Sequence, residues 1–115
     1  MEQSLYPAPS KDLVQKRKEL APEAFAAFQA FSQTVFADGA LPSKTKELIA
    51  VAVAHVTQCP YCIRSHTKRA TLKGATGQEI MEAIWVAAEM RAGAASAHSA
   101  IAIDEMNQEL AKPGG

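Results

Sequence analysis

Four side chains of this sequence stand at a spacing that could support thiol redox chemistry. The two cysteines, Cys59 and Cys62, form a C-x-x-C pair. His66 follows four residues after the pair, and Glu47 stands twelve residues before it. Two thiols three residues apart can close a disulfide with little backbone movement. An imidazole and a carboxylate beside them could take up and return protons. The set therefore predicts a dithiol reaction centre with its own acid/base groups.

The cysteines and the histidine are expected to share one face of a helix. Pro60 suits the first helical position, which puts Cys59 at the cap and Cys62 in the first turn. Cys59, Cys62 and His66 then stand at positions i, i+3 and i+7. The positive end of the helix and its free N–H groups stabilise a thiolate there. Helix position alone favours Cys59 as the attacking thiol, whereas closeness to His66 favours Cys62.

The spacing of the cysteine pair also allows packing, zinc-binding and thioredoxin-like roles. The cysteines could be small buried hydrophobic residues, although a pair beside histidine and proline is unusual for packing. A structural zinc site needs four ligands, usually mostly thiolates, and a set completed by His66 and Glu47 would be uncommon. A thioredoxin-like domain would place the pair near a βαβ unit, which the pattern does not indicate. We expect a redox pair on a helical scaffold, with no metal and no organic cofactor.

The composition indicates a single globular domain. At 115 residues, with 48% hydrophobic and 21% charged side chains, the chain can bury a core and is too apolar for a disordered protein. Twelve basic and twelve acidic side chains cancel, so no partner of nucleic acid or anionic membrane is expected. The apolar run 48–56 is too short to span a bilayer. Because no signal peptide is visible, we expect a cytoplasmic protein, in a compartment where such pairs are redox-active or metal-binding.

The first half of the chain predicts an extended arm and three helices. Prolines keep residues 5–10 extended, and a short helix is expected over 12–20. A second helix begins at Pro22. Its aromatic and aliphatic side chains recur on one face: Phe25, Phe28, Phe31 and Val35. Ser43 is expected to cap a third helix. Residues 48–56 are apolar on nearly every side, which predicts a central, buried helix more than a strand because polar and apolar residues do not alternate.

The second half predicts three more helices, about six in all. The helix that begins at Pro60 should end near Gly74. Thr76 and Glu79 form a capping box that opens the next helix. A last helix is expected from about Gly93, rich in small residues that allow close approach of another helix within the subunit or across an interface. The fold class is therefore all-α.

The remaining side chains are weaker candidates for function. His55 lies within the apolar helix and is more simply a satisfied core histidine. His98 could line the pocket, although a packing or interface role is favoured. Met81 and Trp85, one helical turn apart, are expected in the core. Four basic side chains are expected to form a solvated face that could also steer a partner: Arg64, Lys68, Arg69 and Lys73.

The cysteine motif and its surroundings closely resemble a known family. The segment from Glu47 through Cys59-Pro60-Tyr61-Cys62 to His66, with 73–76 and Glu79-Ile80 after it, is similar to the core of the AhpD-like alkylhydroperoxidases of the carboxymuconolactone decarboxylase superfamily. The motif E-x11-C-x2-C-x3-H is specific because four reactive residues fall at fixed spacing. The resemblance covers about residues 20–105 of a single domain, 1–115. It implies an all-α fold assembled as a homo-trimer or homo-hexamer, with thiol-dependent peroxidase or disulfide reductase activity.

The resemblance also implies a role for each residue of the motif. Cys62 becomes the peroxidatic thiol and Cys59 the resolving thiol, while Glu47 and His66 relay protons. The substrate is a hydroperoxide, and an external dithiol, expected to be a small redox protein, reduces the disulfide. Some members carry a second histidine between the cysteines, where this chain has Tyr61, which could still donate a hydrogen bond to substrate.

Two further functions remain open on the sequence. A lyase acting on a lactone acid, as in the decarboxylase branch, has no use for a cysteine pair. A non-catalytic, redox-regulated oligomeric subunit would hold a reversible disulfide without turnover. Hydroperoxide consumption driven by a dithiol distinguishes both from a peroxidase.

Overall fold

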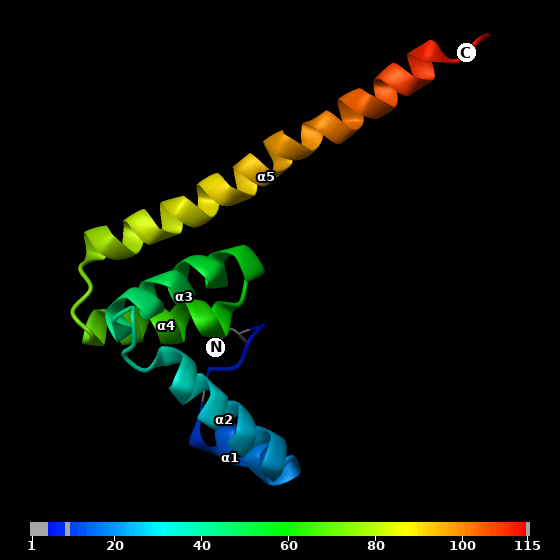
Figure 1. The fold of residues 1–115 in the computed structure, drawn as a ribbon. Helices are drawn as coiled ribbons and strands as arrows, with labels where there is room; N and C mark the ends of the chain where they lie inside the picture. The colour runs from blue at the N-terminus through cyan, green and yellow to red at the C-terminus, as the bar shows by residue number, and fades with distance from the viewer. Residues whose placement is uncertain (1–4, 9, 115) are drawn as a thin grey trace.

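The chain folds into five helices, with no strand among the residues whose structure is described. The computed structural model describes residues 5–8 and 10–114. In chain order the helices are α1 (Lys11–Leu20), α2 (Pro22–Phe36), α3 (Ser43–Thr57), α4 (Pro60–Leu72) and α5 (Gly77–Ala111) (Figure 1). The predicted all-α class is confirmed. The predicted extended arm agrees with residues 5–8 and 10, which are outside any helix; residue 9 lies outside the described residues.

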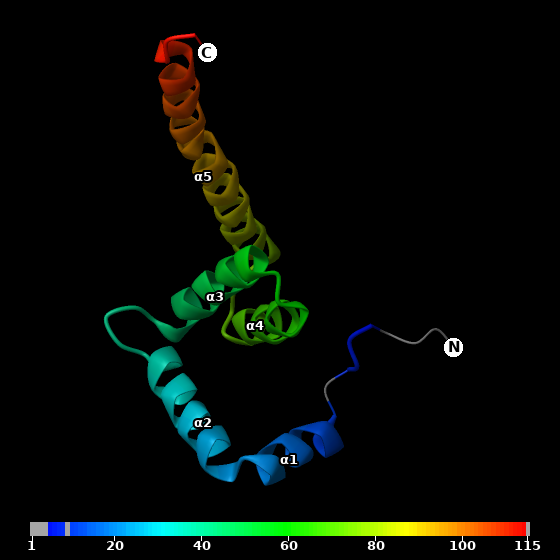
Figure 2. The ribbon, with the colours of Figure 1, turned by 90° about the vertical axis from the view of Figure 1, so that its right-hand side faces the viewer.

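The helices form an open arrangement around a central hairpin. α3 and α4 lie side by side, and the first half of α5 packs along α3. α1 and α2 leave this centre on one side, while the second half of α5 extends away on the other (Figures 1 and 2). The radius of gyration is 20.7 Å, whereas a compact domain of this length has one of about 13 Å. The single chain therefore leaves much surface uncovered.

The core sits where α3, α4 and the start of α5 meet. Val51 and Ala70 are fully buried, and Ala75 is nearly so. Three larger side chains pack against them: Leu48, Ile80 and Ile84. The small alanines let the helix backbones approach closely, so that one valine fills the centre.

The prediction that residues 48–56 form a central, buried helix is confirmed for its position between α4 and α5 and wrong for its full burial in the single chain. Val51 and Ala54 are buried, but Ile49, Val53 and Val56 are about half exposed. The reason is that only α4 and α5 cover α3 to any extent, so its third face has no neighbour in the described chain.

Two predicted helix boundaries also need correction. Ser43 does not cap α3; it is the first helical residue, and its N–H donates to Asp38 Oδ1 at 2.7 Å. Gly93 does not begin a new helix, because α5 runs through it without a break. A glycine within a helix costs only about 1 kcal/mol relative to alanine, and its neighbours here are alanines and other good helix formers. Residues 5–8 and 10–114 therefore hold five helices where about six were expected.

The other local signals are confirmed. Cys59 caps α4 with Pro60 behind it, and Gly74 follows the end of α4 with φ 96°. Thr76 and Glu79 make both bonds of the capping box: the Glu79 N–H donates to Thr76 Oγ1 at 3.1 Å, and the Thr76 N–H donates to Glu79 Oε1 at 2.9 Å.

Several side chains expected in the core lie on the surface. Met81 and Trp85 are more than half exposed, which corrects their assignment to the core. Phe28 and Phe31 of the apolar face of α2 are also more than half exposed. The spacing groups these side chains on one side of α2, but the described chain leaves most of that side exposed. No helix among the described residues is both long and apolar enough to cross a membrane.

Candidate active site

The two cysteines form a disulfide at the start of α4. Their Cα atoms are 5.2 Å apart, within the usual range for a disulfide. Cys59 is the N-cap residue, and its Sγ accepts the N–H of Cys62 at 3.3 Å. This N–H is one of those that a helix leaves unpaired at its first turn. The backbone thus presents a hydrogen-bond donor to the sulfur of Cys59, and both cysteines are half-buried.

A tight turn between α3 and α4 holds the cysteine pair in place. Gln58 ends α3 in the left-handed conformation, with φ 57° and ψ 48°. The next N–H, of Cys59, donates back to the carbonyl of Ala54 at 3.1 Å. A left-handed residue at this point reverses the chain at a helix end. Only Gln58 and Cys59 therefore separate the two helices, and α4 starts directly beside the end of α3.

Glu47 and His66 form a hydrogen-bonded pair between α3 and α4. His66 Nδ1 lies 2.7 Å from Glu47 Oε2, and the two side chains are 16% and 3% exposed, the histidine being the more exposed. A buried carboxylate requires such a partner. With Nδ1–H donating to Glu47, the Nε2 atom of His66 is left to exchange protons. The two residues are nineteen positions apart in the chain, and the helix pair brings them together.

An aromatic ring that carries no signal in the sequence packs on the imidazole. The ring of Phe36, the last residue of α2, stacks on His66 with centroids 5.0 Å apart and an angle of 25° between planes. This contact fixes the plane of the imidazole from the side of α2. No local pattern could have indicated this role of Phe36, because the contact depends on how α2 meets α4.

Tyr61, the residue between Pro60 and Cys62, contacts the N-terminal arm. Its hydroxyl donates to the carbonyl of Pro7 at 2.9 Å. Its ring meets that of Tyr6 edge to face, with centroids 6.0 Å apart. The arm therefore lies beside the helix turn that carries the disulfide. A hydrogen bond from Tyr61 to substrate remains a prediction.

The other two histidines lie away from this cluster. His55 is half-buried on α3, and its Nδ1 bonds the carbonyl of Val51 at 2.7 Å, as expected for a satisfied histidine. His98 is exposed on α5, and its predicted place in the pocket stays a prediction. Within residues 5–8 and 10–114, no three histidine, cysteine or acidic side chains come together as a metal site would require.

The described residues thus combine a disulfide at a helix N-terminus with a Glu47–His66 pair inside a helical hairpin. Comparison with known families shows which class of protein has this combination. The chain belongs to the carboxymuconolactone decarboxylase family, whose model matches residues 22–105. The family resemblance drawn from the cysteine motif is thereby confirmed.

Three proteins from other organisms illustrate this similarity. Over 73 residues the chain is 71% identical to uncharacterized protein 4 in the cox locus of Paracoccus denitrificans, a match that covers 64% of this chain and 66% of that protein. A carboxymuconolactone decarboxylase family protein from Legionella pneumophila has a similar structure, with a TM-score of 0.66 and 38% identity. The match covers 69% of this chain and 70% of that chain. A protein from Methanobacterium thermoautotrophicum gives a TM-score of 0.68 at 39% identity, with 74% of this chain and 94% of that chain covered.

Proposed function

We propose that the protein is a thiol-dependent peroxidase that reduces hydroperoxides through Cys59 and Cys62. The observation that carries this proposal is the hydrogen bond between Glu47 and His66 beside a cysteine pair at a helix N-terminus. A packing role for the cysteines would not need a buried carboxylate held on an imidazole one turn away. A dithiol that reacts with a peroxide needs such groups, because protons must leave the thiols and reach the departing oxygen.

In the first step the thiolate of Cys62 attacks the terminal oxygen of the hydroperoxide. A sulfur–oxygen bond forms and the oxygen–oxygen bond breaks. The departing alkoxide takes a proton from His66 and leaves as an alcohol. Cys62 is favoured as the attacking group because His66 follows it by one helical turn on the same face. Glu47 orients the imidazole and stabilises it when it is charged.

In the second step Cys59 resolves the sulfenic acid left on Cys62. His66 takes the proton of Cys59, and the resulting thiolate attacks the sulfur of Cys62. The disulfide forms, the sulfur–oxygen bond breaks, and the departing hydroxide takes that proton back from His66 and leaves as water. The N–H of Cys62, which points at Cys59 Sγ, stabilises this thiolate. Two thiols thus reduce one hydroperoxide to one alcohol and one water. An external dithiol, a small redox protein of the cytoplasm in this proposal, returns the pair to thiols by exchange.

The proposal includes assembly into a homo-trimer or homo-hexamer. The extended shape and the apolar side chains that one chain leaves exposed support this part. Exposed apolar surface of this extent is unusual for a monomer and marks a contact surface. Light scattering on the purified protein measures the mass directly, and a monomer at micromolar concentration would contradict it.

The central experiment follows hydroperoxide consumption by the reduced protein in the presence of a dithiol. We expect turnover in the unmodified protein, background rates in Cys62→Ser, and a single unresolved oxidation event in Cys59→Ser. Intact mass after one equivalent of peroxide should show loss of two hydrogens in the unmodified protein and gain of one oxygen in Cys59→Ser. Turnover by Cys62→Ser, or none by the unmodified protein with several peroxides and dithiols, would refute the proposed activity.

A further inference from the structure

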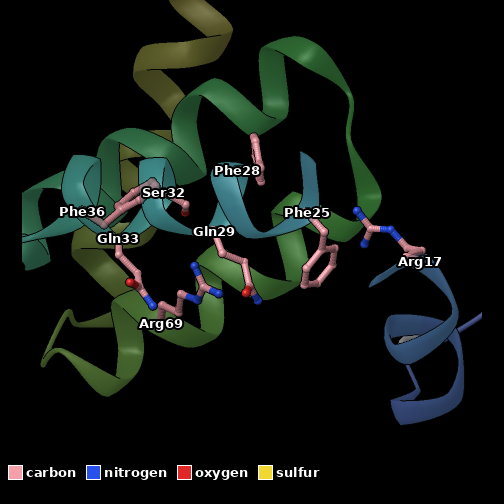
Figure 3. A pocket seen from close by; sticks show the side chains of 8 residues that line it. All are labelled: Arg17, Phe25, Phe28, Gln29, Ser32, Gln33, Phe36 and Arg69. Carbon is pink, nitrogen blue, oxygen red and sulfur yellow. The ribbon is translucent and has the colours of Figure 1, made fainter. Parts of the chain in front are cut away.

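A cavity of about 450 Å³ opens between α1, α2 and α4 (Figure 3). Its size falls in the range of pockets that hold small organic ligands. Its lining combines phenyl rings, amides and guanidinium groups: Phe25, Phe36, Gln29, Gln33, Arg17 and Arg69. In Figure 3 the two arginines reach the cavity from opposite ends, with side chains of α2 between them. The pocket therefore combines phenyl rings and polar side chains of α2 along its wall with a guanidinium group at each end.

The charges in this pocket have no acidic partner among the described residues. The ion pairs of the described residues join other side chains, and neither Arg17 nor Arg69 takes part in one of them. Arg17 lies over the ring of Phe25, 5.8 Å from its centroid. A guanidinium group binds a carboxylate through two parallel hydrogen bonds, and nearby amides can add more. The lining thus matches a molecule with an anionic head and an apolar body.

The pocket adjoins the dithiol site through two residues. Phe36 forms part of its wall and stacks on His66. Arg69 comes seven residues after Cys62 on α4, and positions i, i+4 and i+7 place Cys62, His66 and Arg69 on one face of the helix. Seven residues of an α-helix rise about 10 Å. A ligand held at Arg69 would therefore have to extend about 10 Å along α4, past His66, to meet the attacking sulfur.

We propose that Arg69 binds the carboxylate of the substrate, which makes the substrate class the hydroperoxides of organic acids. This inference deepens the proposed peroxidase function and rests on it. An extended chain spans about 3.5 Å for every three bonds. The rise of about 10 Å between the two backbone positions corresponds to about nine bonds of such a chain, the separation of carboxylate and peroxide in a fatty acid hydroperoxidised near the middle of its chain. The phenyl rings of α2 cover the apolar body, and Arg17 adds positive potential at the far end.

The kinetic test compares one peroxide with and without its charge. The probes are linoleic acid hydroperoxidised on its ninth carbon and the methyl ester of the same compound, both below the concentration at which they aggregate. We expect kcat/KM for the acid to exceed that for the ester by about tenfold to a hundredfold, mainly through KM. In Arg69→Gln the ratio should fall to near one. Arg64→Gln, a change on the same helix and outside the pocket, should keep both the ratio and the activity.

A binding test separates this inference from the peroxidase proposal. Decanoate has the carboxylate and the apolar chain but no peroxide, so calorimetric titration measures the pocket without any chemistry. We expect the unmodified protein and Arg64→Gln to bind it equally, and Arg69→Gln to bind it at least tenfold more weakly. Equal turnover of acid and ester, or a ratio that survives in Arg69→Gln, overturns the inference while leaving the peroxidase intact. If no peroxide is consumed, the titration alone decides the pocket, and absence of binding overturns it.

Discussion

The α3–α4 hairpin and the second half of α5 (residues 94–111) are both helical and rich in apolar residues, yet they are stabilised differently. In the hairpin Val51 is fully buried, and the buried Glu47 carboxylate has its partner in His66. In the second half of α5 the large apolar side chains are all more than half exposed: Ile101, Ile103, Met106 and Leu110. The hairpin thus has a buried core, formed with the start of α5, whereas the second half of α5 has no large apolar side chain covered within the described chain.

This difference shows where the chemistry resides. α3 supplies Glu47, and α4 with its cap supplies both cysteines and the histidine, so the proposed reaction centre needs only one hairpin. Isolated helices are marginal in water, and most helical stability comes from packing of an apolar face. The described chain supplies no such packing for the second half of α5, which under the proposed assembly would come from another subunit. Changes in the hairpin should act on activity and subunit stability, and changes in α5 on assembly.

The largest expected effect comes from removing the charge of Glu47. In Glu47→Gln the side chain keeps its size, but it no longer stabilises a charged His66. Positioned acid/base groups contribute about a hundredfold to ten-thousandfold to a rate, and we expect kcat/KM for hydroperoxide to fall within that range. Peroxide consumption with a dithiol measures this, with circular dichroism to confirm folding. Glu82→Gln, at an exposed position of α5, is the matched control. Full activity in Glu47→Gln would remove the carboxylate from the mechanism.

A smaller effect tests the contrast between the two regions directly. Val51→Ala removes two methyl groups from the centre of the core, which should cost about 2 kcal/mol of unfolding free energy at every protein concentration. Ile103→Ala removes more apolar surface from the second half of α5, where the side chain is 51% exposed. We expect its melting temperature to depend on protein concentration, with a loss only where the protein is assembled.

Thermal unfolding of both variants over a wide range of protein concentration decides between the two behaviours. If Ile103→Ala lowers the melting temperature as much as Val51→Ala at every concentration, the two regions are stabilised in the same way. The contrast drawn from their exposure would then be wrong.

Signals that act over a few residues allowed much of this fold to be predicted. Pro60 after Cys59, Gly74 at a positive φ and the pair Thr76–Glu79 each determine one helix end through bonds made within one turn. The motif around Cys59 was predictable for the same reason, because its members share one helix.

The parts that were mispredicted depend on contacts between distant residues. The exposure of Ile49 and Trp85 depends on which neighbour covers them, and apolar spacing alone does not specify a neighbour. Gly93 is only a weak signal for a helix boundary, and α5 continues through it because its neighbours favour the helix. The stacking of Phe36 on His66 and the place of Arg69 in a pocket follow from the angle between α2 and α4, which no local pattern encodes.

The smallest expected effect lies at the start of α5, where it joins the hairpin. The Thr76 N–H donates a hydrogen bond to Glu79 Oε1, and Lys44 Nζ of α3 lies 3.0 Å from Glu79 Oε2. Both contacts, the backbone hydrogen bond most of all, lower the pKa of Glu79 below its ordinary value. A lowered pKa in the folded state means that the carboxylate contributes stability above the pKa of the unfolded chain, about 4.3. This contribution is lost as the pH falls from there through the folded pKa.

Glu79→Gln isolates that contribution, because glutamine can keep the bond to the Thr76 N–H without the charge. We expect the variant to be slightly less stable than the unmodified protein at pH 7, and the difference to disappear on acidification below about pH 4. Urea unfolding at a series of pH values measures both effects, with Glu82→Gln as the charge-matched control. A difference that stays constant with pH would mean that the attachment of α5 to α3 relies on packing of Ile80 and Ile84, and that the charge of Glu79 contributes nothing to it.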